Sequence, residues 1–559
     1  MAARRGFRIP PSRETRVLRR RGELELAESI HDCGALKDGK MASSPLKNPR
    51  RRHAPAFWPS SALRNLAVER LRLRFRALIW AKTPAPGSTR VFQRTASSLR
   101  GICALAGLLG LVACGPSAPP NIVLVSLDTT RADHLGAYGY KGGTSPELDR
   151  FAERAVIYER AYATSSWTLP THASMFTGLL PMQHGAQSVP EGPNRSLGYG
   201  VRPLAESFTT LAELLADAGY RTAAVIGGPA LRSELGLAQG FEFYDDDLSG
   251  PGARFHGKRA EQVADAAVEL VGRFGSEPWF LFVNFFDPHA PYNPPPPHDR
   301  GLQSADSITQ LASLIESLET RAPPHAVDDY TEKQRQWIAR MLAGYDAEIR
   351  YMDAHLGRLL AAITASPRAD ETLIVITADH GESFGEHYFV SHGAHLYEHN
   401  VRVPLLIRHP DTRGVTRVDT PVQTHRLFAT LLGSAGLPVP EPADPGDISS
   451  PGTDVVLQVQ RSDSNVRLFG DFFDRDLLAI QSWPHKLVIE TTGDHELFDL
   501  DDDPEELHNL IVDEPELAHS LATRLREAAA QHPGLFSEDA RAELRPSTEA
   551  ALRALGYLD

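Results

Sequence analysis

Acidic residues and histidines follow three strongly apolar runs of the sequence. Asp128 follows "NIVLVSL", Asp287 and His289 follow "WFLFVNFF", and Asp379 and His380 follow "TLIVITA". Apolar runs of this length, rich in β-branched and aromatic residues, are typical of strands buried on both faces of a parallel sheet. The carboxyl ends of parallel strands meet at one edge of the sheet, where open α/β sheets bind ligands. Carboxylates and a histidine at that edge predict a divalent-metal site.

Each of these residues also has a purely structural interpretation, because an aspartate at the end of a strand is most often a turn residue or a helix cap. Three clusters on one inferred edge favour the metal site over that interpretation. The histidine-rich stretch "HGESFGEHYFVSHGAHLYEH", which follows Asp379, favours it as well. Within this stretch we select His392, together with Asp287, as a candidate for substrate binding or for a second metal. His387 and His395, taken singly, are more typical of solvated loop residues.

The stretch "SSWTLPTHASMFTG" places Thr168 two residues before Pro170. Proline suits the first turn of a helix, so Thr168 is expected at or just before a helix N-terminus. Free N–H groups and the helix dipole favour an anion there. A hydroxyl at this position can coordinate a metal, lose its proton and attack phosphorus or sulfur. A threonine that only caps the helix gives the same local pattern, so both interpretations stay open at this point.

The remaining pattern predicts the architecture that positions these residues. Helices such as "YDAEIRYMDAHLGRLLAAI" alternate with apolar strands, which predicts an α/β fold whose mostly parallel central sheet is sandwiched by helices. A Pro/Gly-rich break covers residues 437–453. Beyond it, "NVRLFGDFF", "LLAIQSW" and "HKLVIE" predict a small antiparallel C-terminal sheet, closed by a helical tail after Pro515. We expect a catalytic domain over residues 121–440 and a C-terminal subdomain with its tail over residues 454–559.

The charge of the chain is unevenly distributed. Residues 1–100 contain 23 lysines and arginines against 7 acidic residues, whereas the rest of the chain is strongly acidic. This imbalance predicts that residues 1–90 are a basic extension, either disordered or preceding the true start of translation. No nucleic acid is expected as a partner. The chain has three cysteines and none after Cys114, so the body is expected to have neither a disulfide nor a cysteine ligand for zinc.

Residues 91–114 resemble a lipoprotein signal peptide. An apolar run of 13 residues, Gly101 to Ala113, follows Arg94 and Arg100 and ends at Cys114. The run is too short to span a bilayer comfortably and has the length of a signal-peptide core. Its end resembles the bacterial lipobox, in which the cysteine is lipidated. We expect an exported protein, anchored on the periplasmic side of a bacterial cell envelope through Cys114. A short buried helix with a chance cysteine is the alternative.

Seven ordered motifs resemble the sulfatase family of the alkaline phosphatase superfamily. They cover roughly residues 121–511 and read "NIVLVSLDTTRADHLGAYGY", "SPELDRFAERAVIYERAYATSSWTLPTHASMFTGLLPMQHG", "FDPHAPYNPP", "YDAEIRYMDAHLGRLL", "TADHGESFGEH", "LYEHNVRVPLLIR" and "HELFDLDDDPEELHNL". The resemblance implies the fold inferred above. It also implies that Asp128, Asp379 and His380 are metal ligands, that Thr168 stands at the catalytic position, and that His289 contacts the ester group. The metal that the family implies is calcium.

The departures from the family pattern point to a rebuilt site. Thr168 stands where sulfatases carry a cysteine or serine that is oxidised to formylglycine. The same oxidation of a threonine cannot give an aldehyde, so no formylglycine is expected. His172 replaces the motif arginine, Thr129 replaces the second aspartate of a pair, and Gly393 occupies the approximate place of a lysine. The set resembles the threonine-nucleophile phosphodiesterases and phosphotransferases of the superfamily, for which zinc or manganese is also plausible.

The sequence therefore predicts a metal-dependent hydrolase of a sulfate or phosphate ester. Thr168 is the expected direct nucleophile and a further metal contact, and His172 and His289 complete the expected catalytic set. Two alternatives remain at this stage. One is a phosphotransferase of the cell envelope that uses the same threonine. The other is a sulfatase-like binding protein without turnover.

Overall fold

The computed structural model describes residues 119–189, 201–249, 257–299, 330–450, 454–462, 465–466 and 471–534. All of the described residues belong to one compact unit, which lies within residues 111–559. The basic extension and the signal peptide predicted at residues 1–90 and 91–114 lie outside the described residues. No helix in the described part of the chain combines the length and the apolar character that a membrane span requires.

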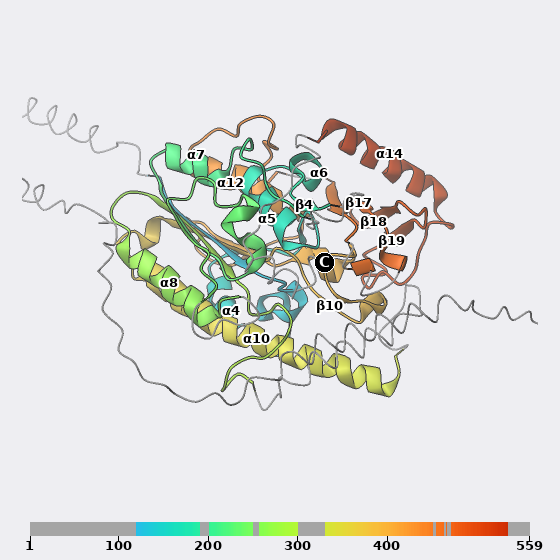
Figure 1. The fold of residues 1–559 in the computed structure, drawn as a ribbon, viewed down its shortest axis with the longest axis horizontal. Helices are drawn as coiled ribbons and strands as arrows, with labels where there is room; N and C mark the ends of the chain where they lie inside the picture. Colours follow the sequence, from blue (N-terminus) through green and yellow to red (C-terminus); the bar gives the residue numbers. More distant parts are fainter. Residues whose placement is uncertain are drawn as a thin grey trace, which may run out of the picture. The chain divides into compact units, whose positions relative to one another are not determined.

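The central sheet has eight strands in the order β14-β2-β13-β9-β1-β8-β6-β7 (Figure 1). Strands β9, β1, β8, β6 and β7 are parallel to one another, whereas β13 is antiparallel to β9 and β2. The mostly parallel sheet that the sequence predicts is confirmed. The strand bounds are Asn121–Leu127 (β1), Val156–Tyr158 (β2), Arg221–Val225 (β6), Phe243–Asp245 (β7), Trp279–Phe285 (β8), Thr372–Thr377 (β9), Leu405–Arg408 (β13) and Thr416–Val418 (β14).

Helices cover both faces of this sheet (Figure 1). One layer contains α4 (Pro146–Ala152), α8 (Ala260–Arg273) and α10 (Glu332–Thr364), with α10 packed against the other two. The opposite layer contains α5 (Thr168–Thr177), α7 (Leu211–Asp217) and α12 (Leu427–Ser434), which contact one another. Capping boxes stand at the N-termini of two of these helices. Thr210 and Glu213 form a capping box at α7, and Thr331 and Gln334 form one at α10.

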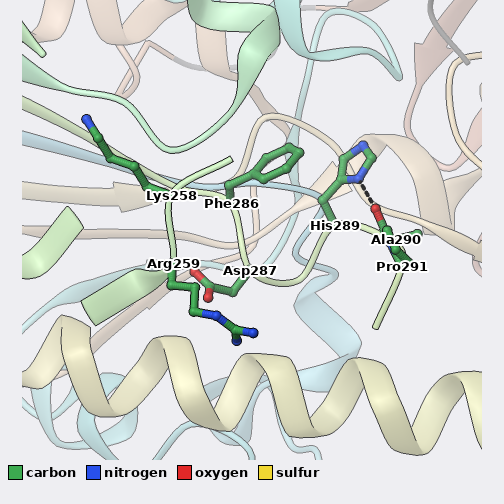
Figure 2. A pocket seen from close by; sticks show the side chains of 7 residues that line it. All are labelled: Lys258, Arg259, Phe286, Asp287, His289, Ala290 and Pro291. Carbon is green, nitrogen blue, oxygen red and sulfur yellow. Dashed lines mark hydrogen bonds between the residues drawn. The ribbon is translucent and has the colours of Figure 1, made fainter. Parts of the chain in front are cut away.

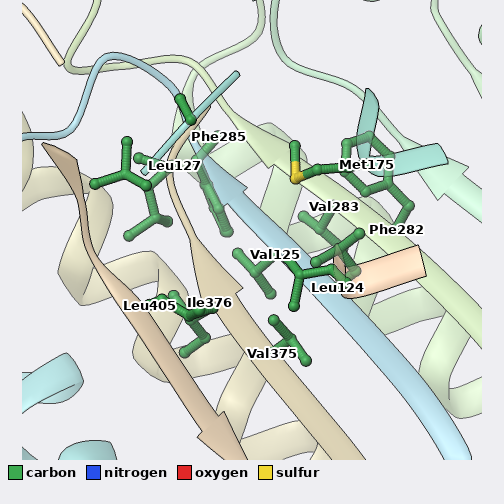
Figure 3. Close-up of a cluster of buried hydrophobic side chains, with 14 of the residues drawn as sticks. Leu124, Val125, Leu127, Met175, Phe282, Val283, Phe285, Val375, Ile376 and Leu405 are labelled. Atoms are coloured by element: carbon green, nitrogen blue, oxygen red, sulfur yellow. The ribbon is translucent and has the colours of Figure 1, made fainter. Parts of the chain in front are cut away.

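The three central strands form the most deeply buried part of the core. Every residue of β1, β8 and β9 is buried. Val125 of β1 pairs with Val283 of β8 on one side and with Ile376 of β9 on the other, and Figure 3 shows these apolar side chains together. The backbone N–H of Asp128 continues the pairing by donating to the Phe285 carbonyl at 2.9 Å. This register places the carboxyl ends of β9, β1 and β8 side by side.

A four-stranded antiparallel sheet forms the C-terminal part, as predicted. Its order is β16-β17-β18-β19, and α14 (Pro515–Gln531) packs against β17 and β18. The bounds are Val455–Val459 (β16), Leu477–Ser482 (β17), His485–Glu490 (β18) and Glu496–Asp499 (β19).

One strand of this sheet differs from the prediction. "NVRLFGDFF" does not supply a strand in its described part, where Asp471–Phe473 form a 3-10 turn. The strand is instead Val455–Val459, directly after the Pro/Gly-rich break. In the described part of this stretch, Phe473 packs against the rings of Phe389 and His395.

Short elements complete the described fold. A three-stranded ladder has the order β12-β3-β15, and two-stranded ladders join β4 with β5 and β10 with β11. Their bounds are Ala161–Tyr162 (β3), Gln187–Ser188 (β4), Val201–Arg202 (β5), Ser383–Phe384 (β10), Val390–Ser391 (β11), Arg402–Val403 (β12) and Val422–Gln423 (β15), with helices at Pro181–His184 (α6) and Glu398–Val401 (α11).

Candidate active site

Asp128, Asp379 and His380 converge at the carboxyl ends of β1 and β9. One ligand atom of each residue lies within 4.8 Å of the others, and all three side chains are buried. The two strands are direct neighbours in the sheet, so the chain brings together residues about 250 positions apart. A group of two carboxylates and one imidazole can hold a divalent metal.

Two carboxylate oxygens of this group lack hydrogen-bond partners. Asp379 Oδ1 accepts hydrogen bonds from the backbone N–H of Thr129 (3.1 Å) and of His380 (2.9 Å). Asp379 Oδ2 and Asp128 Oδ1 accept none, although both atoms are buried. A buried polar atom without a partner is costly and rare in folded proteins. Because a cation between these oxygens would remove that cost, the donor set fits the metal that the sequence predicts.

The tautomer of His380 is set by its backbone contact. Nδ1 lies 2.9 Å from the carbonyl oxygen of Gly381, to which it donates. Nε2 therefore carries the lone pair and lies 3.2 Å from the hydroxyl oxygen of Thr168 and 3.4 Å from Asp379 Oδ2. An imidazole held by its other nitrogen in this way is a typical arrangement for a metal ligand.

Thr168 is the first residue of α5, and its hydroxyl is directed at this group. Trp167 occupies the N-cap position, and no side chain caps the helix. The Thr168 hydroxyl makes its contact with His380 instead of with an N–H group of its own helix. The helix N-terminus and the acidic group thus meet at the Thr168 oxygen, and the cap-only interpretation of Thr168 does not describe its contacts.

Thr129 holds an uncommon backbone conformation beside the acidic group. Its φ is 52°, in the left-handed region that threonine rarely adopts. This conformation directs its N–H at Asp379 and its carbonyl at the hydroxyl of Tyr345, at 2.8 Å. The Thr129 hydroxyl oxygen is buried and makes no hydrogen bond. Strain of this kind persists where the surrounding contacts hold it, and it is frequent at functional sites.

His172 lies behind Thr168. It is fully buried and packs edge-on against the rings of Phe282 and Phe176. Nδ1 donates to the carbonyl oxygen of Thr168 at 2.8 Å, and Nε2 lies 2.9 Å from the hydroxyl oxygen of Ser126 on β1. Both ring nitrogens are thus engaged by the protein, and the contacts of His172 tie the start of α5 to the central strand.

Burial and mutual charge perturb the titration of the group. Burial raises the pKa of Asp128, and the nearby charge of Asp379 raises it further. Burial alone would also raise the pKa of Asp379, but the neighbouring His380 and His172 outweigh it and hold that pKa below its usual value. Burial lowers the pKa of His380 and of His172. Among the described residues, no lysine or arginine pairs with either of these two acids.

His289 and Asp287 follow β8 and line a pocket together with Lys258, Arg259, Phe286, Ala290 and Pro291 (Figure 2). His289 Nδ1 donates to the carbonyl oxygen of Ala290 at 2.7 Å, and its ring stacks on Phe286. Asp287 points toward Arg259 and away from His289 (Figure 2). The fold thus brings His289 near the acidic group but does not bring Asp287 into it.

His392 connects the histidines of the site. Its ring lies against His380, with centroids 4.4 Å apart, and edge-on to His289 at 4.9 Å. Its Nδ1 lies 3.1 Å from a carboxylate oxygen of Glu382. Burial lowers the pKa of His392 to about 4, and burial together with His392 lowers that of His289 to about 3. The sequence pointed to His392 but not to Glu382, because an acid after "DHG" has no distinctive spacing.

A family comparison accounts for this combination of fold and site. The sulfatase family profile matches residues 120–437, more than half of the chain, and the chain belongs to the sulfatase family. It is therefore a sulfatase-family ester hydrolase with a buried Asp-Asp-His group that can hold a metal. A second profile, described as the C-terminal part of N-sulphoglucosamine sulphohydrolase, matches residues 385–531.

Individual relatives have low sequence identity to this chain but align over most of its length. The sulfatase YidJ of Escherichia coli is 26% identical over 446 residues, which cover 70% of this chain and 83% of that protein. The arylsulfatase of Clostridium perfringens is 24% identical and covers 71% of this chain and 91% of that protein. Among solved structures, the phosphonate monoester hydrolase of Agrobacterium radiobacter shares the fold, with a TM-score of 0.57 and 22% identity over 74% of this chain and 96% of that chain.

Proposed function

We propose that the protein is a metal-dependent hydrolase of a phosphate or sulfate ester in which Thr168 is the direct nucleophile. The observation that carries this proposal is the position of the Thr168 hydroxyl, 3.2 Å from His380 Nε2 and at the N-terminus of α5. No formylglycine is required, since the threonine oxygen is itself the attacking atom. The threonine nucleophile favours a phosphorus centre as the preferred target, although the family name indicates sulfate esters.

The residues that would hold the metal are Asp128, Asp379, His380 and the hydroxyl of Thr168. Their oxygen-rich set suits calcium, the ion implied by the family, and the single imidazole also allows zinc or manganese. When bound, a divalent ion lowers the pKa of a coordinated hydroxyl and neutralises charge on the transferred group. A second metal at Asp287 and His392 gains no support from the contacts of Asp287, which is directed toward Arg259.

The other residues act through orientation and hydrogen bonding. The Thr168 oxygen attacks phosphorus or sulfur, and the N-terminus of α5 favours the anionic group as it arrives. As this bond forms, the bond from phosphorus or sulfur to the leaving oxygen breaks, and the leaving alcohol departs with a proton from solvent that replaces the one Thr168 gives up. His289 and His392 face the ester from the neighbouring loops, where their low pKa values make them neutral hydrogen-bonding groups and not a substitute for a lysine charge. His172 acts as a positioning residue, because it holds the Thr168 carbonyl against β1. Water then releases the covalent intermediate from Thr168.

Turnover on matched esters tests this proposal. Protein loaded with calcium, zinc or manganese is given an aryl sulfate, an aryl phosphate monoester and an aryl phosphodiester with the same leaving group. We expect hydrolysis of a phosphorus ester and a phosphate-sized adduct on the peptide that contains Thr168 in quenched samples. Transfer to an added alcohol in preference to water would favour the phosphotransferase alternative. An absence of turnover on all three esters with every metal would favour the binding protein.

We also propose that the protein is exported and anchored through lipidated Cys114 in a bacterial cell envelope. The support is the sequence alone, since residues 91–114 lie outside the described residues. Cys114→Ser should release the protein from the membrane fraction. The wild type should resist washing with salt, because several acyl chains anchor stably where a single chain does not. A mature N-terminus well before Cys114 would contradict this proposal.

A further inference from the structure

The buried carboxylate of Glu382 lies directly behind the histidine that faces the proposed reaction centre. Glu382 is 1% exposed and follows His380 by two positions. One of its oxygens lies 3.1 Å from His392 Nδ1, and the other accepts a hydrogen bond from the Tyr292 hydroxyl at 3.3 Å. The carboxylate thus joins a residue of the loop after β8 to a residue of the histidine-rich segment.

We propose that Glu382 is a positioning residue that orients the His392 imidazole toward the ester held at Thr168. This inference rests on the proposed function, because it assigns a task to a residue of that same site. When Glu382 is ionised its oxygen can only accept, so the contact then places the proton on Nδ1 of His392. The tautomer and the ring orientation are therefore fixed together, and Nε2 becomes the edge turned away from Glu382.

The rings around His392 place the imidazole next to the proposed reaction centre. The imidazole sits between His380, whose Nε2 contacts Thr168, and His289, which stands at the pocket after β8. His392 therefore joins the two sides of the proposed reaction centre. A rotation that broke the Glu382 contact would also move Nε2 away from this position.

The surroundings of Glu382 make this contact specific. The rings of Tyr292, Tyr345 and Phe384 pack against one another next to the carboxylate, and Tyr292 also bonds to it. Hydrogen bonds are stronger in such a low-dielectric environment, and a buried partner that loses its contact is costly. Carboxylates behind histidines play this orienting part at many metal and catalytic sites.

The first experiment is a double-mutant cycle on the metal-loaded enzyme. Glu382→Ala should reduce turnover by about 10- to 100-fold, the usual effect of removing such a supporting partner. Glu382→Gln should restore part of the loss, because its amide oxygen can still accept from Nδ1. In a His392→Ala background, the effect of Glu382→Ala should nearly vanish, since residues that act through one another are not additive. Equal effects in both backgrounds would overturn the proposal.

A second readout does not depend on turnover. In proton NMR the wild type should show a downfield imidazole N–H signal that disappears in His392→Ala. The same signal should disappear in Glu382→Ala and persist, at a shifted position, in Glu382→Gln. A signal unchanged in Glu382→Ala would overturn the contact. An enzyme that shows the expected signals but hydrolyses no ester would contradict the proposed function while upholding the orientation of His392.

Glu496 supplies a matched control. It is a carboxylate bonded to a tyrosine hydroxyl, that of Tyr397, at 3.0 Å, but it belongs to β19 of the C-terminal sheet. Glu496→Ala should lower the melting temperature without changing turnover per folded molecule or the His392 signal. If Glu496→Ala reduced turnover as strongly as Glu382→Ala, general loosening of the fold would explain both, and the positioning role would be rejected.

Discussion

Two groups of buried charges differ in how the protein compensates them. In the C-terminal sheet, Lys486 is fully buried and pairs with Glu506 at 2.8 Å and with Glu398 at 3.3 Å. At the edge of the central sheet, Asp128 and Asp379 pair with no lysine or arginine anywhere in the described part of the chain, and Asp379 lies beside the imidazoles of His172 and His380. The first group is completed by the fold itself, whereas the second is left for a ligand.

The Lys486 group stabilises the fold, whereas the Asp128 and Asp379 group is available for ligand binding. Burial opposes the charge on Lys486, but Glu506 and Glu398 outweigh it and hold the pKa of Lys486 above its usual value. An ion pair of this kind fixes the β18 strand against the segment that contains Glu398. A buried acid without a cation lowers the stability of the fold. Such an acid is therefore expected where it binds a ligand.

The largest expected effect is at Thr168. Thr168→Ala removes the attacking oxygen and should abolish turnover, whereas Thr168→Ser keeps the hydroxyl and should retain measurable activity. If the residue served only as a helix cap, Ala would cost about 0.5–2 kcal/mol of stability and leave the chemistry intact. Kinetics and thermal melts of both variants separate the two roles. A fully active Thr168→Ala enzyme would remove Thr168 from the mechanism.

Next in size are the proposed metal ligands. Asp128→Asn, Asp379→Asn and His380→Ala should each reduce activity by about 100-fold, because each removes a ligand and not a packing contact. Metal removal by a chelator should abolish wild-type activity, and added metal should restore it. Added metal at 100 times its Kd should stabilise the wild type by about 2.7 kcal/mol. That stabilisation should be lost in Asp379→Asn. Near wild-type turnover of Asp379→Asn would contradict the assignment.

Much of the fold, and part of this site, could be predicted from the sequence. Apolar strands that end in Asp128 and Asp379 gave the sheet and its functional edge, because neighbouring parallel strands end together. The partner of His392 could not be predicted, since Glu382 reaches it through a turn and not through a regular repeat. That turn joins β10 to β11, which pair Ser383 with Ser391, and it contains left-handed backbone at His387 and Tyr388. The strand at Val455–Val459 was missed because "NVRLFGDFF" carries the same apolar content.

Substitution of Lys486 is expected to reduce stability but not turnover. Lys486→Ala leaves the buried Glu506 and the part-buried Glu398 without their cation, and an unpaired buried charge typically costs about 3–5 kcal/mol of stability. Chemical unfolding should show this loss, whereas turnover per folded molecule at low temperature should stay close to that of the wild type. Lys486→Met, which keeps most of the volume, should be destabilised as well, because the acids remain unpaired. A loss of turnover in a fully folded Lys486→Met enzyme would contradict the purely structural role of Lys486.

The smallest expected effect on turnover is at His172, which supports the fold and also contacts the proposed site. His172 is as buried as Lys486, yet it contacts the backbone of Thr168, the proposed nucleophile. His172→Ala should reduce turnover by about 10-fold through a displaced Thr168, since small misplacements at reacting atoms are costly. Stability should fall by about 1–3 kcal/mol, because the Thr168 carbonyl and the Ser126 hydroxyl lose a buried partner. Ser126→Ala removes only the contact at Nε2 and should show smaller losses of turnover and of stability.

Because His172 touches no ester in the proposed site, kcat should fall in His172→Ala while KM stays constant. A raised KM with unchanged kcat would instead assign His172 to substrate binding, and its two internal hydrogen bonds would then have to break during catalysis.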